Sequence, residues 1–164
     1  MTVREGRPED ADAIASIYNQ GIAERGATFE TELRTPSDIV NRFTDDGQYP
    51  TLVAVEHGLV IGWAGLSTYR ARACYAGIAE FSIYLDRDAR GRGIGRELLD
   101  ALIAAAAARG YWKLVSRIFP FNAASRALCR SCGFREVGVY EKHGRLDGQW
   151  LDVVIVERLI DENL

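Results

Sequence analysis

The sequence predicts a single α/β domain, residues 1–164, built on a mixed β-sheet. Segments with the alternation of strands are interleaved with segments that have the period of helices, in the order β-α-α-β-β-β-α-β-α-β-β. No Pro/Gly/Ser-rich linker and no internal repeat divides the chain. Its 164 residues suit one domain and are enough to enclose a hydrophobic core.

The first part of the chain is expected to form a strand and two helices. Residues 2–6 are a short strand candidate. A helix is predicted over residues 7–21, because Pro8 suits a first turn and apolar residues recur on one face. A second helix is predicted over residues 35–43, with Thr35 as its N-cap and a proline directly after it.

The central part is expected to supply three strands. Residues 49–69 have the pattern of a hairpin that turns at His57 and Gly58. Residues 76–86 alternate strictly, so that two sets of side chains face opposite sides of the sheet: Ala79, Phe81, Ile83 and Leu85 on one side, and Glu80, Ser82 and Tyr84 on the other.

The last part is expected to add two helices and three strands. Strong helix formers fill residues 95–110, and Gly110 ends that helix. A strand is expected over residues 111–119, followed by a helix over 122–134 that begins at Asn122 and ends at Gly133. Two final strands, over 135–144 and 149–160, are joined by a turn over 144–148.

Composition argues against several classes of protein. The net charge of −3 lacks the basic field that drives binding to nucleic acid. No apolar run reaches the roughly 18 residues of a membrane span, and the polar N-terminus does not resemble a signal peptide. Three cysteines do not form a disulfide framework. We therefore expect a cytoplasmic protein that binds neither nucleic acid nor membrane.

The segment RDARGRGIG, residues 87–95, joins a predicted strand to a predicted helix. Glycine-rich loops at such junctions often bind phosphate, because free N–H groups and the helix dipole converge on an anion. The dinucleotide fingerprint does not fit, since Arg96 stands where its last glycine belongs and residues 111–119 contain no acidic residue. The P-loop does not fit either, because no lysine follows a glycine.

A third phosphate-binding pattern does fit this loop. Arg90-x-x-Gly93-x-Gly95 resembles the Gln/Arg-x-x-Gly-x-Gly/Ala motif of the GNAT acetyltransferase superfamily, and the order of elements is similar to GNAT proteins over residues 3–160. By itself the motif also fits a turn with solvated arginines. The resemblance implies a mostly antiparallel central sheet with a splay between two central strands, flanked by helices. It also implies that acetyl-CoA is the co-substrate and that no metal is needed. The residues that the resemblance assigns to the diphosphate of acetyl-CoA are Arg90, Gly91, Arg92, Gly93, Ile94, Gly95 and Arg96.

Within this superfamily, four segments resemble the phosphinothricin and arsinothricin N-acetyltransferase group: IYNQGIAERGATFET, STYRARACYAGIAEFSIYL, FPFNAASRALCRSCGF and GRLDGQWLDV. The group acetylates the amine of small amino-acid analogues, including phosphinothricin, arsinothricin and methionine sulfoximine or sulfone. The resemblance therefore implies a small-molecule amine acceptor and a homodimer. Two alternatives stay open, namely acetylation of a protein N-terminus and a CoA-binding sensor without turnover.

The resemblance assigns roles to residues of the predicted strand and of the last helix. Glu80 falls on the catalytic glutamate, which fits the need to deprotonate an amine before it attacks a thioester, although its position also fits an exposed acid on a polar strand face. Three further residues, Ile83, Tyr84 and Leu85, fall on the stretch beside the pantetheine arm, where a backbone amide can stabilise the developing oxyanion. Asn122 and Ser125 fall on residues that contact CoA, and Asn122 also suits an N-cap.

The acceptor site is assigned by resemblance to Phe29, Arg72 and Tyr75, with Arg72 suited to pair with a carboxylate. The alternatives are a core phenylalanine and a solvated loop. Whether Arg70, His143 or Asp147 also lines this site is left open; Asp147 stands where some relatives have histidine.

Two cysteines need a separate interpretation. By resemblance, Cys129 occupies the position of a tyrosine that protonates the leaving thiolate in many GNAT enzymes. Either another group or water therefore supplies this proton, or the thiolate leaves without being protonated. Cys129 and Cys132 form a C-x-x-C pair without the further ligands of a metal site, which favours a buried structural pair.

Overall fold

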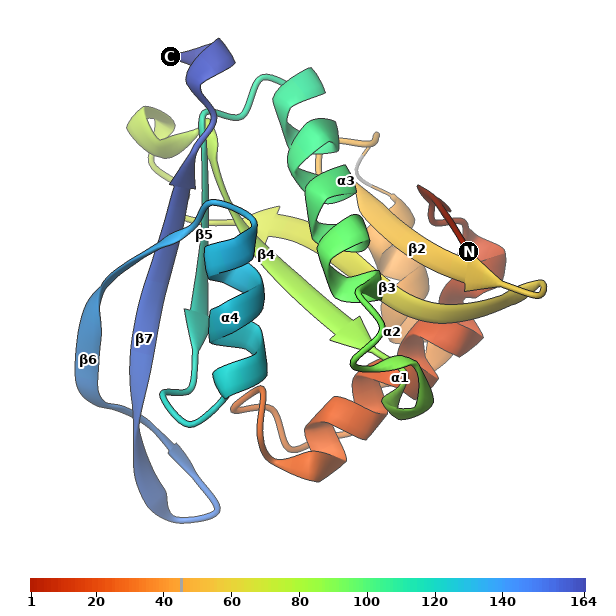
Figure 1. Cartoon of the computed structure of the whole chain (residues 1–164), viewed down its shortest axis with the longest axis horizontal. Coiled ribbons are helices and arrows are strands. Elements are labelled where there is room, and N and C mark those ends of the chain that lie inside the picture. Colours follow the sequence, from red (N-terminus) through yellow and green to blue (C-terminus); the bar gives the residue numbers. More distant parts are fainter. Residues whose placement is uncertain (45) are drawn as a thin grey trace.

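The computed structural model describes residues 1–44 and 46–164 and shows one seven-stranded sheet flanked by helices (Figure 1). The strand order is β1-β2-β3-β4-β5-β7-β6, and every neighbouring pair is antiparallel except β4 and β5. The strands are β1 Thr2–Glu5, β2 Thr51–Glu56, β3 Leu59–Thr68, β4 Ile78–Leu85, β5 Lys113–Ile118, β6 Arg135–Leu146 and β7 Gln149–Leu159. The predicted α/β class with a mixed, mostly antiparallel sheet is confirmed.

Four helices cover the two faces of the sheet: α1 Ala11–Glu24, α2 Pro36–Val40, α3 Ile94–Ala108 and α4 Ala123–Ser131. Helices α3 and α4 pack on one face, where Leu98, Leu102 and Cys129 join the larger core. Helices α1 and α2 pack on the other face, where Ile14 and Trp63 belong to the second core. Burial of these two apolar faces is the main stabilising contribution.

Local sequence signals set most helix ends as expected. Thr35 and Asp38 form a capping box at the start of α2, with the Thr35 N–H bonded to Asp38 at 2.8 Å. The side chain of Asn122 caps α4 by accepting a hydrogen bond from the Ser125 N–H. Gly110 follows α3 with φ +86°, the left-handed conformation typical of a residue just past a helix end.

Two predicted boundaries were wrong. The first helix does not end at Gly21 but continues to Glu24. Gly21 is a buried position within it that needs a small residue, since a Cβ there would be 2.8 Å from carbons of the Tyr84 ring. The final turn is shorter than expected. Strand β6 runs on to Leu146, and Asp147 and Gly148 alone make the turn, with φ of +49° and +80° as in a type I′ hairpin.

Candidate active site

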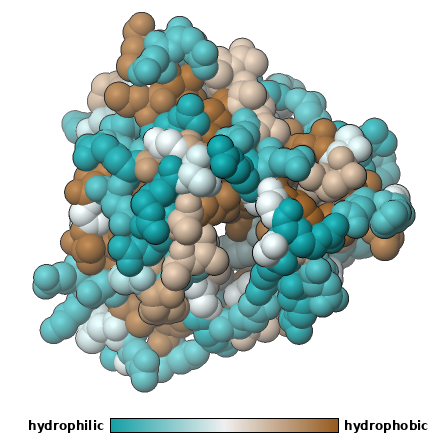
Figure 2. Space-filling view, in the orientation of Figure 1, coloured by the Kyte–Doolittle hydropathy of each residue, from teal (hydrophilic) through white to brown (hydrophobic). Residues whose placement is uncertain are grey.

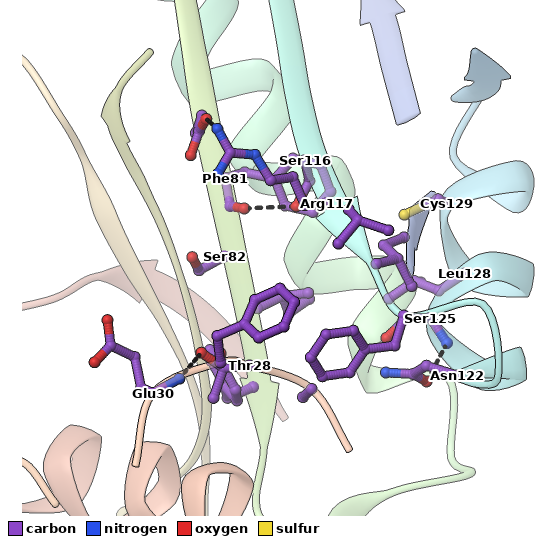
Figure 3. A pocket seen from close by; sticks show the side chains of 18 of the residues that line it. Thr28, Glu30, Phe81, Ser82, Ser116, Arg117, Asn122, Ser125, Leu128 and Cys129 are labelled. Carbon is purple, nitrogen blue, oxygen red and sulfur yellow. Dashed lines mark hydrogen bonds and ion pairs between the residues drawn. The ribbon is translucent and has the colours of Figure 1, made fainter. Parts of the chain in front are cut away.

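The central feature of the site is the divergence of β4 from β5. The two strands pair in parallel only from Ile78–Lys113 to Glu80–Val115, although β4 continues to Leu85 and β5 to Ile118. One hydrogen bond, from the Ser116 hydroxyl to the Phe81 carbonyl at 3.0 Å, bridges the strands just beyond the last pair (Figure 3). The predicted splay is therefore present, and it leaves backbone groups of both strands available to a ligand.

A cavity of about 370 Å³ opens at this divergence. Figure 2 shows a hollow near the middle of the face that carries α3 and α4. The cavity walls come from β4, β5, α4 and the segment between α1 and α2, with single residues from α1 and β7. The lining residues are Tyr18, Ala27, Thr28, Phe29, Glu30, Glu80, Phe81, Ser82, Ile83, Tyr84, Ser116, Arg117, Ile118, Phe119, Asn122, Ser125, Leu128, Cys129 and Val153.

Glu80 lies in the wall of this cavity, at the last position where β4 pairs with β5. Its carboxylate accepts a hydrogen bond from the Arg117 guanidinium of β5 at 3.2 Å, and the Glu80 side chain is 27% exposed. A partly desolvated carboxylate beside a cavity can accept a proton from a bound ligand. Arg117 was missed by the sequence interpretation. The one available signal was the alternation of this strand, which places Arg117 with Lys113 and Val115 on the side opposite the buried Leu114 and Ile118.

The segment between α1 and α2 covers the cavity and is fastened at several points. The Phe29 ring packs edge-on against Phe119 at 4.9 Å between centroids, and Gly144 of β6 approaches so closely that a Cβ there would lie 2.7 Å from the Phe29 ring. The Asn122 amide donates to the Gly26 carbonyl at 3.3 Å. Arg25 and Asp147 form an ion pair at 3.0 Å, which connects this segment to the β6–β7 turn. These contacts hold the segment in place as one wall of the cavity.

The glycine-rich loop lies between β4 and α3, with two glycines in the left-handed region. Gly91 has φ +75°, and Gly93, the N-cap of α3, has φ +81°; an added Cβ at either would meet no atom within 4 Å. These positions suit glycine for its conformation and leave the start of α3 open. Gly95 is helical, and a Cβ there would make ordinary contact with Leu128 at 3.4 Å. The free N–H groups of the first turn of α3 can thus receive a diphosphate.

The arginines around this loop are paired with carboxylates. Arg90 forms two hydrogen bonds with Glu24, at 2.8 and 3.2 Å, and they hold the pKa of Glu24 below its ordinary value. Arg92 pairs with Glu56, and Arg96 lies 3.8 Å from the carboxylate of Asp100. All three arginine side chains are exposed, and such pairs contribute only about 0–1 kcal/mol each. A multiply charged phosphate group can compete for these guanidinium groups.

The structure brings six of the predicted site residues to the cavity wall: Phe29, Glu80, Ile83, Tyr84, Asn122 and Ser125. Leu85 and the loop over residues 90–96 lie beside the cavity rather than in its wall, and the Leu85 carbonyl accepts a hydrogen bond from Arg90 at 3.4 Å. The Ile94 side chain is buried in the core, so that only its backbone is available to a ligand. Burial raises the pKa of Tyr84, which packs against Tyr18 and Trp63.

Two residues that were predicted to bind the acceptor do not line the cavity. Arg72 and Tyr75 belong to the segment between β3 and β4 and are absent from the residues that line the cavity. The Tyr75 ring packs edge-on against Tyr69, and the Arg72 side chain is exposed. His143 lies beside Tyr140 on β6, with ring centroids 4.8 Å apart. Their roles toward an acceptor stay predictions.

The described residues contain no group of three or more His, Cys, Asp or Glu side chains that could hold a metal ion. Among the helices described, none combines the length and the apolar character needed to span a bilayer.

The three cysteines differ in burial. Cys74 is exposed, whereas burial raises the pKa of the Cys129 thiol to about 12 and also raises the pKa of Cys132. Because the thiolate is the reactive form, we expect iodoacetamide at about pH 8 to modify Cys74 alone in the native protein and all cysteines after unfolding. Peptide mass spectrometry measures this, with Cys74→Ser as the control. Rapid native labelling of Cys129 would contradict the assigned burial.

Comparison with known proteins adds a family to this geometry. A model described as the acetyltransferase (GNAT) family matches residues 16–134. An L-methionine sulfoximine/L-methionine sulfone acetyltransferase of Pseudomonas aeruginosa is 34% identical over 166 residues, covering 98% of this chain and 95% of that protein.

Two solved structures are similar over nearly the whole chain. One is a GNAT superfamily phosphinothricin acetyltransferase from Sinorhizobium meliloti in complex with acetyl-CoA, with a TM-score of 0.90, 33% identity, and coverage of 97% of this chain and 88% of that chain. The other is a ribosomal-protein-alanine N-acetyltransferase from Brucella melitensis, with a TM-score of 0.92, 34% identity, and coverage of 98% and 100%.

Proposed function

Because this chain belongs to the GNAT family and is an acetyl-CoA-dependent N-acetyltransferase, we propose that it acetylates the free amine of a small amino-acid analogue, with Glu80 as general base. One observation carries the proposal. Glu80 lies where β4 and β5 separate, in the wall of a covered cavity. The carboxylate therefore faces the space in which a thioester and an amine would meet.

The donor would lie along the separated strands. The N–H groups at the start of α3 would receive the diphosphate, with help from Arg90, Arg92 and Arg96 after release from their carboxylates. The backbone of residues 83–85 would run beside the pantetheine arm, and Asn122 and Ser125 would contact it from the start of α4. In this arrangement the thioester would lie near Glu80.

The chemistry follows as a direct transfer. Glu80, directly or through a water, takes a proton from the acceptor ammonium, and the free amine then attacks the thioester carbon. An N–C bond forms, the C–S bond breaks, and the nitrogen gives up its second proton to water as the amide forms. A backbone amide of β4 stabilises the charge that develops on the carbonyl oxygen. Cys129 is no proton donor for the leaving thiolate, because a thiol with a pKa of about 12 is a much weaker acid than a free thiol near 8.5. The thiolate is protonated by water.

A small acceptor fits the cavity better than a protein N-terminus. The segment between α1 and α2 covers the site through Phe29 and through the Arg25–Asp147 pair, whereas a peptide needs an open groove. Protein N-terminal acetylation is the second candidate, because the similar Brucella melitensis protein is a ribosomal-protein-alanine N-acetyltransferase.

A panel of amines tests the proposal. Release of the CoA thiol would be followed with L-methionine sulfone, L-methionine sulfoximine, phosphinothricin, arsinothricin and a short peptide beginning with alanine. We expect turnover of at least one small amino acid and none of the peptide. Turnover of the peptide alone would favour the second candidate. No thiol release with any amine would favour a CoA-binding sensor and overturn the assignment of acceptor and base.

We also infer that the protein forms a homodimer. Strand β6 is an edge of the sheet, and it exposes large apolar side chains together with the neighbouring β7: Val137, Val139, Tyr140 and Trp150. Such an edge favours pairing with a second copy. Light scattering is expected to give twice the chain mass of 18.2 kDa, and a mass of one chain at micromolar concentration would contradict the dimer.

A further inference from the structure

Arg117 has a special place among the residues that line the cavity. It is the one arginine or lysine in the described part of the cavity wall, which otherwise contains the acidic Glu30 and Glu80 and uncharged side chains. A ligand with a negative group would therefore find a single cationic partner inside the site. Arg34 pairs with Glu30 of the wall at 2.8 Å but does not itself line the cavity.

The Arg117 guanidinium uses only part of its hydrogen-bonding capacity. Within the described residues it makes one hydrogen bond, to Glu80, and its side chain is 53% exposed. A guanidinium has five N–H donors, so that others face the cavity or solvent. A single contact of this kind between partly exposed groups contributes little, and a ligand can replace it at small cost.

We propose that Arg117 binds the carboxylate of an α-amino acid acceptor while Glu80 receives the amine of the same molecule. The inference rests on the proposed function and defines its acceptor class: α-amino acids rather than simple amines. Arg117, rather than Arg72, which does not line the cavity, then provides the contact that selects the acceptor.

Charge complementarity supports this assignment. An α-amino acid carries its ammonium and its carboxylate on the same carbon, and Glu80 and Arg117 present the opposite charges on atoms 3.2 Å apart. When the zwitterion binds, two charged contacts replace one, and both protein charges keep a partner of opposite sign. The planar guanidinium can also bind the carboxylate through two parallel hydrogen bonds.

The same geometry explains why an amine without a carboxylate would be a poor acceptor. Such an amine offers Arg117 no partner, so the guanidinium stays with Glu80 and competes with the ammonium for the carboxylate. Binding the α-amino acid removes that competition and leaves Glu80 free to take the proton. Arg117 thus contributes to the choice of acceptor and to the availability of the base.

The test compares two acceptors that differ only in the carboxylate: L-methionine sulfone and 3-(methylsulfonyl)propylamine. For the wild-type protein we expect a strong preference for L-methionine sulfone in kcat/KM. Arg117→Met should lower kcat/KM for L-methionine sulfone by about 10- to 100-fold, mainly through KM, and change the value for the amine by less than about threefold. Arg117→Lys, which keeps the charge, should recover part of the loss.

Arg135→Met, a loss of the same charge at an exposed position of β6, is the matched control and should behave as wild type toward both acceptors. An equal loss with both acceptors would show that Arg117 only positions Glu80, and no loss would exclude any role; either result overturns the inference. Wild-type turnover with equal efficiency on both acceptors would overturn it while leaving the acetyltransferase assignment intact. Absence of turnover with every amine would instead overturn the proposed function, on which the inference rests. Unfolding temperatures of both Arg117 variants would separate these outcomes from misfolding.

Discussion

Glu80→Gln is expected to lower kcat by about 10²–10⁴-fold, the contribution usual for a general base. The amide keeps the size and the hydrogen-bonding position of the carboxylate beside Arg117, but it cannot accept a proton from the acceptor ammonium. The proposed donor site lies in the separated strands and the loop before α3, so the affinity for acetyl-CoA should stay within about twofold of wild type. Thiol release at saturating L-methionine sulfone measures the first quantity, and calorimetric titration with acetyl-CoA measures the second.

Glu162→Gln is the matched control, because Glu162 is exposed in the last residues of the chain. It should leave both quantities unchanged. If Glu80→Gln keeps the wild-type kcat, Glu80 is not the base, and a water or another carboxylate of the cavity must take the proton. If the variant instead loses acetyl-CoA affinity, the change has disturbed the divergence of β4 and β5 rather than proton transfer.

Leu98→Ala is expected to cost about 3 kcal/mol of unfolding free energy and to lower Tm by about 6–12 °C. Leu98 is fully buried in the core between α3 and the sheet, where a Cβ placed on Gly62 would lie 3.6 Å from it. Truncation removes apolar contacts and leaves a cavity that the surrounding strands fill only in part. Circular dichroism during thermal or urea unfolding measures the loss.

Leu59→Ala is the control for this substitution, since Leu59 is 69% exposed at the turn between β2 and β3. Its unfolding free energy should stay within about 0.5 kcal/mol of wild type. A loss below about 1 kcal/mol for Leu98→Ala would mean that this part of the core can collapse around the smaller side chain. The packing of α3 against the sheet would then tolerate more change than its burial indicates.

Much of the fold could be predicted because its signals are local. Thr35 and Asn122 cap their helices through side-chain hydrogen bonds with residues three positions away, and the alternation of residues 78–85 decides which face of the sheet each side chain takes. The same alternation placed Glu80 on the side away from the main core. The end of the first helix could not be predicted in this way, because the tolerance of Gly21 depends on Tyr84 in another element.

The candidate site shows the same difference between features that a local pattern predicts and features that depend on distant residues. The sequence alone determined the family and the donor, because Arg90, Gly93 and Gly95 lie within six residues and the required backbone conformation belongs to the loop itself. Only the tertiary structure decided which charges meet. Arg117 reaches Glu80 across 37 positions, and Glu24 reaches Arg90 across 66. These contacts depend on where the parallel pairing of β4 and β5 stops and on how α1 packs against the sheet. Such distances in space follow from strand order and register, and no local pattern of residues specifies them.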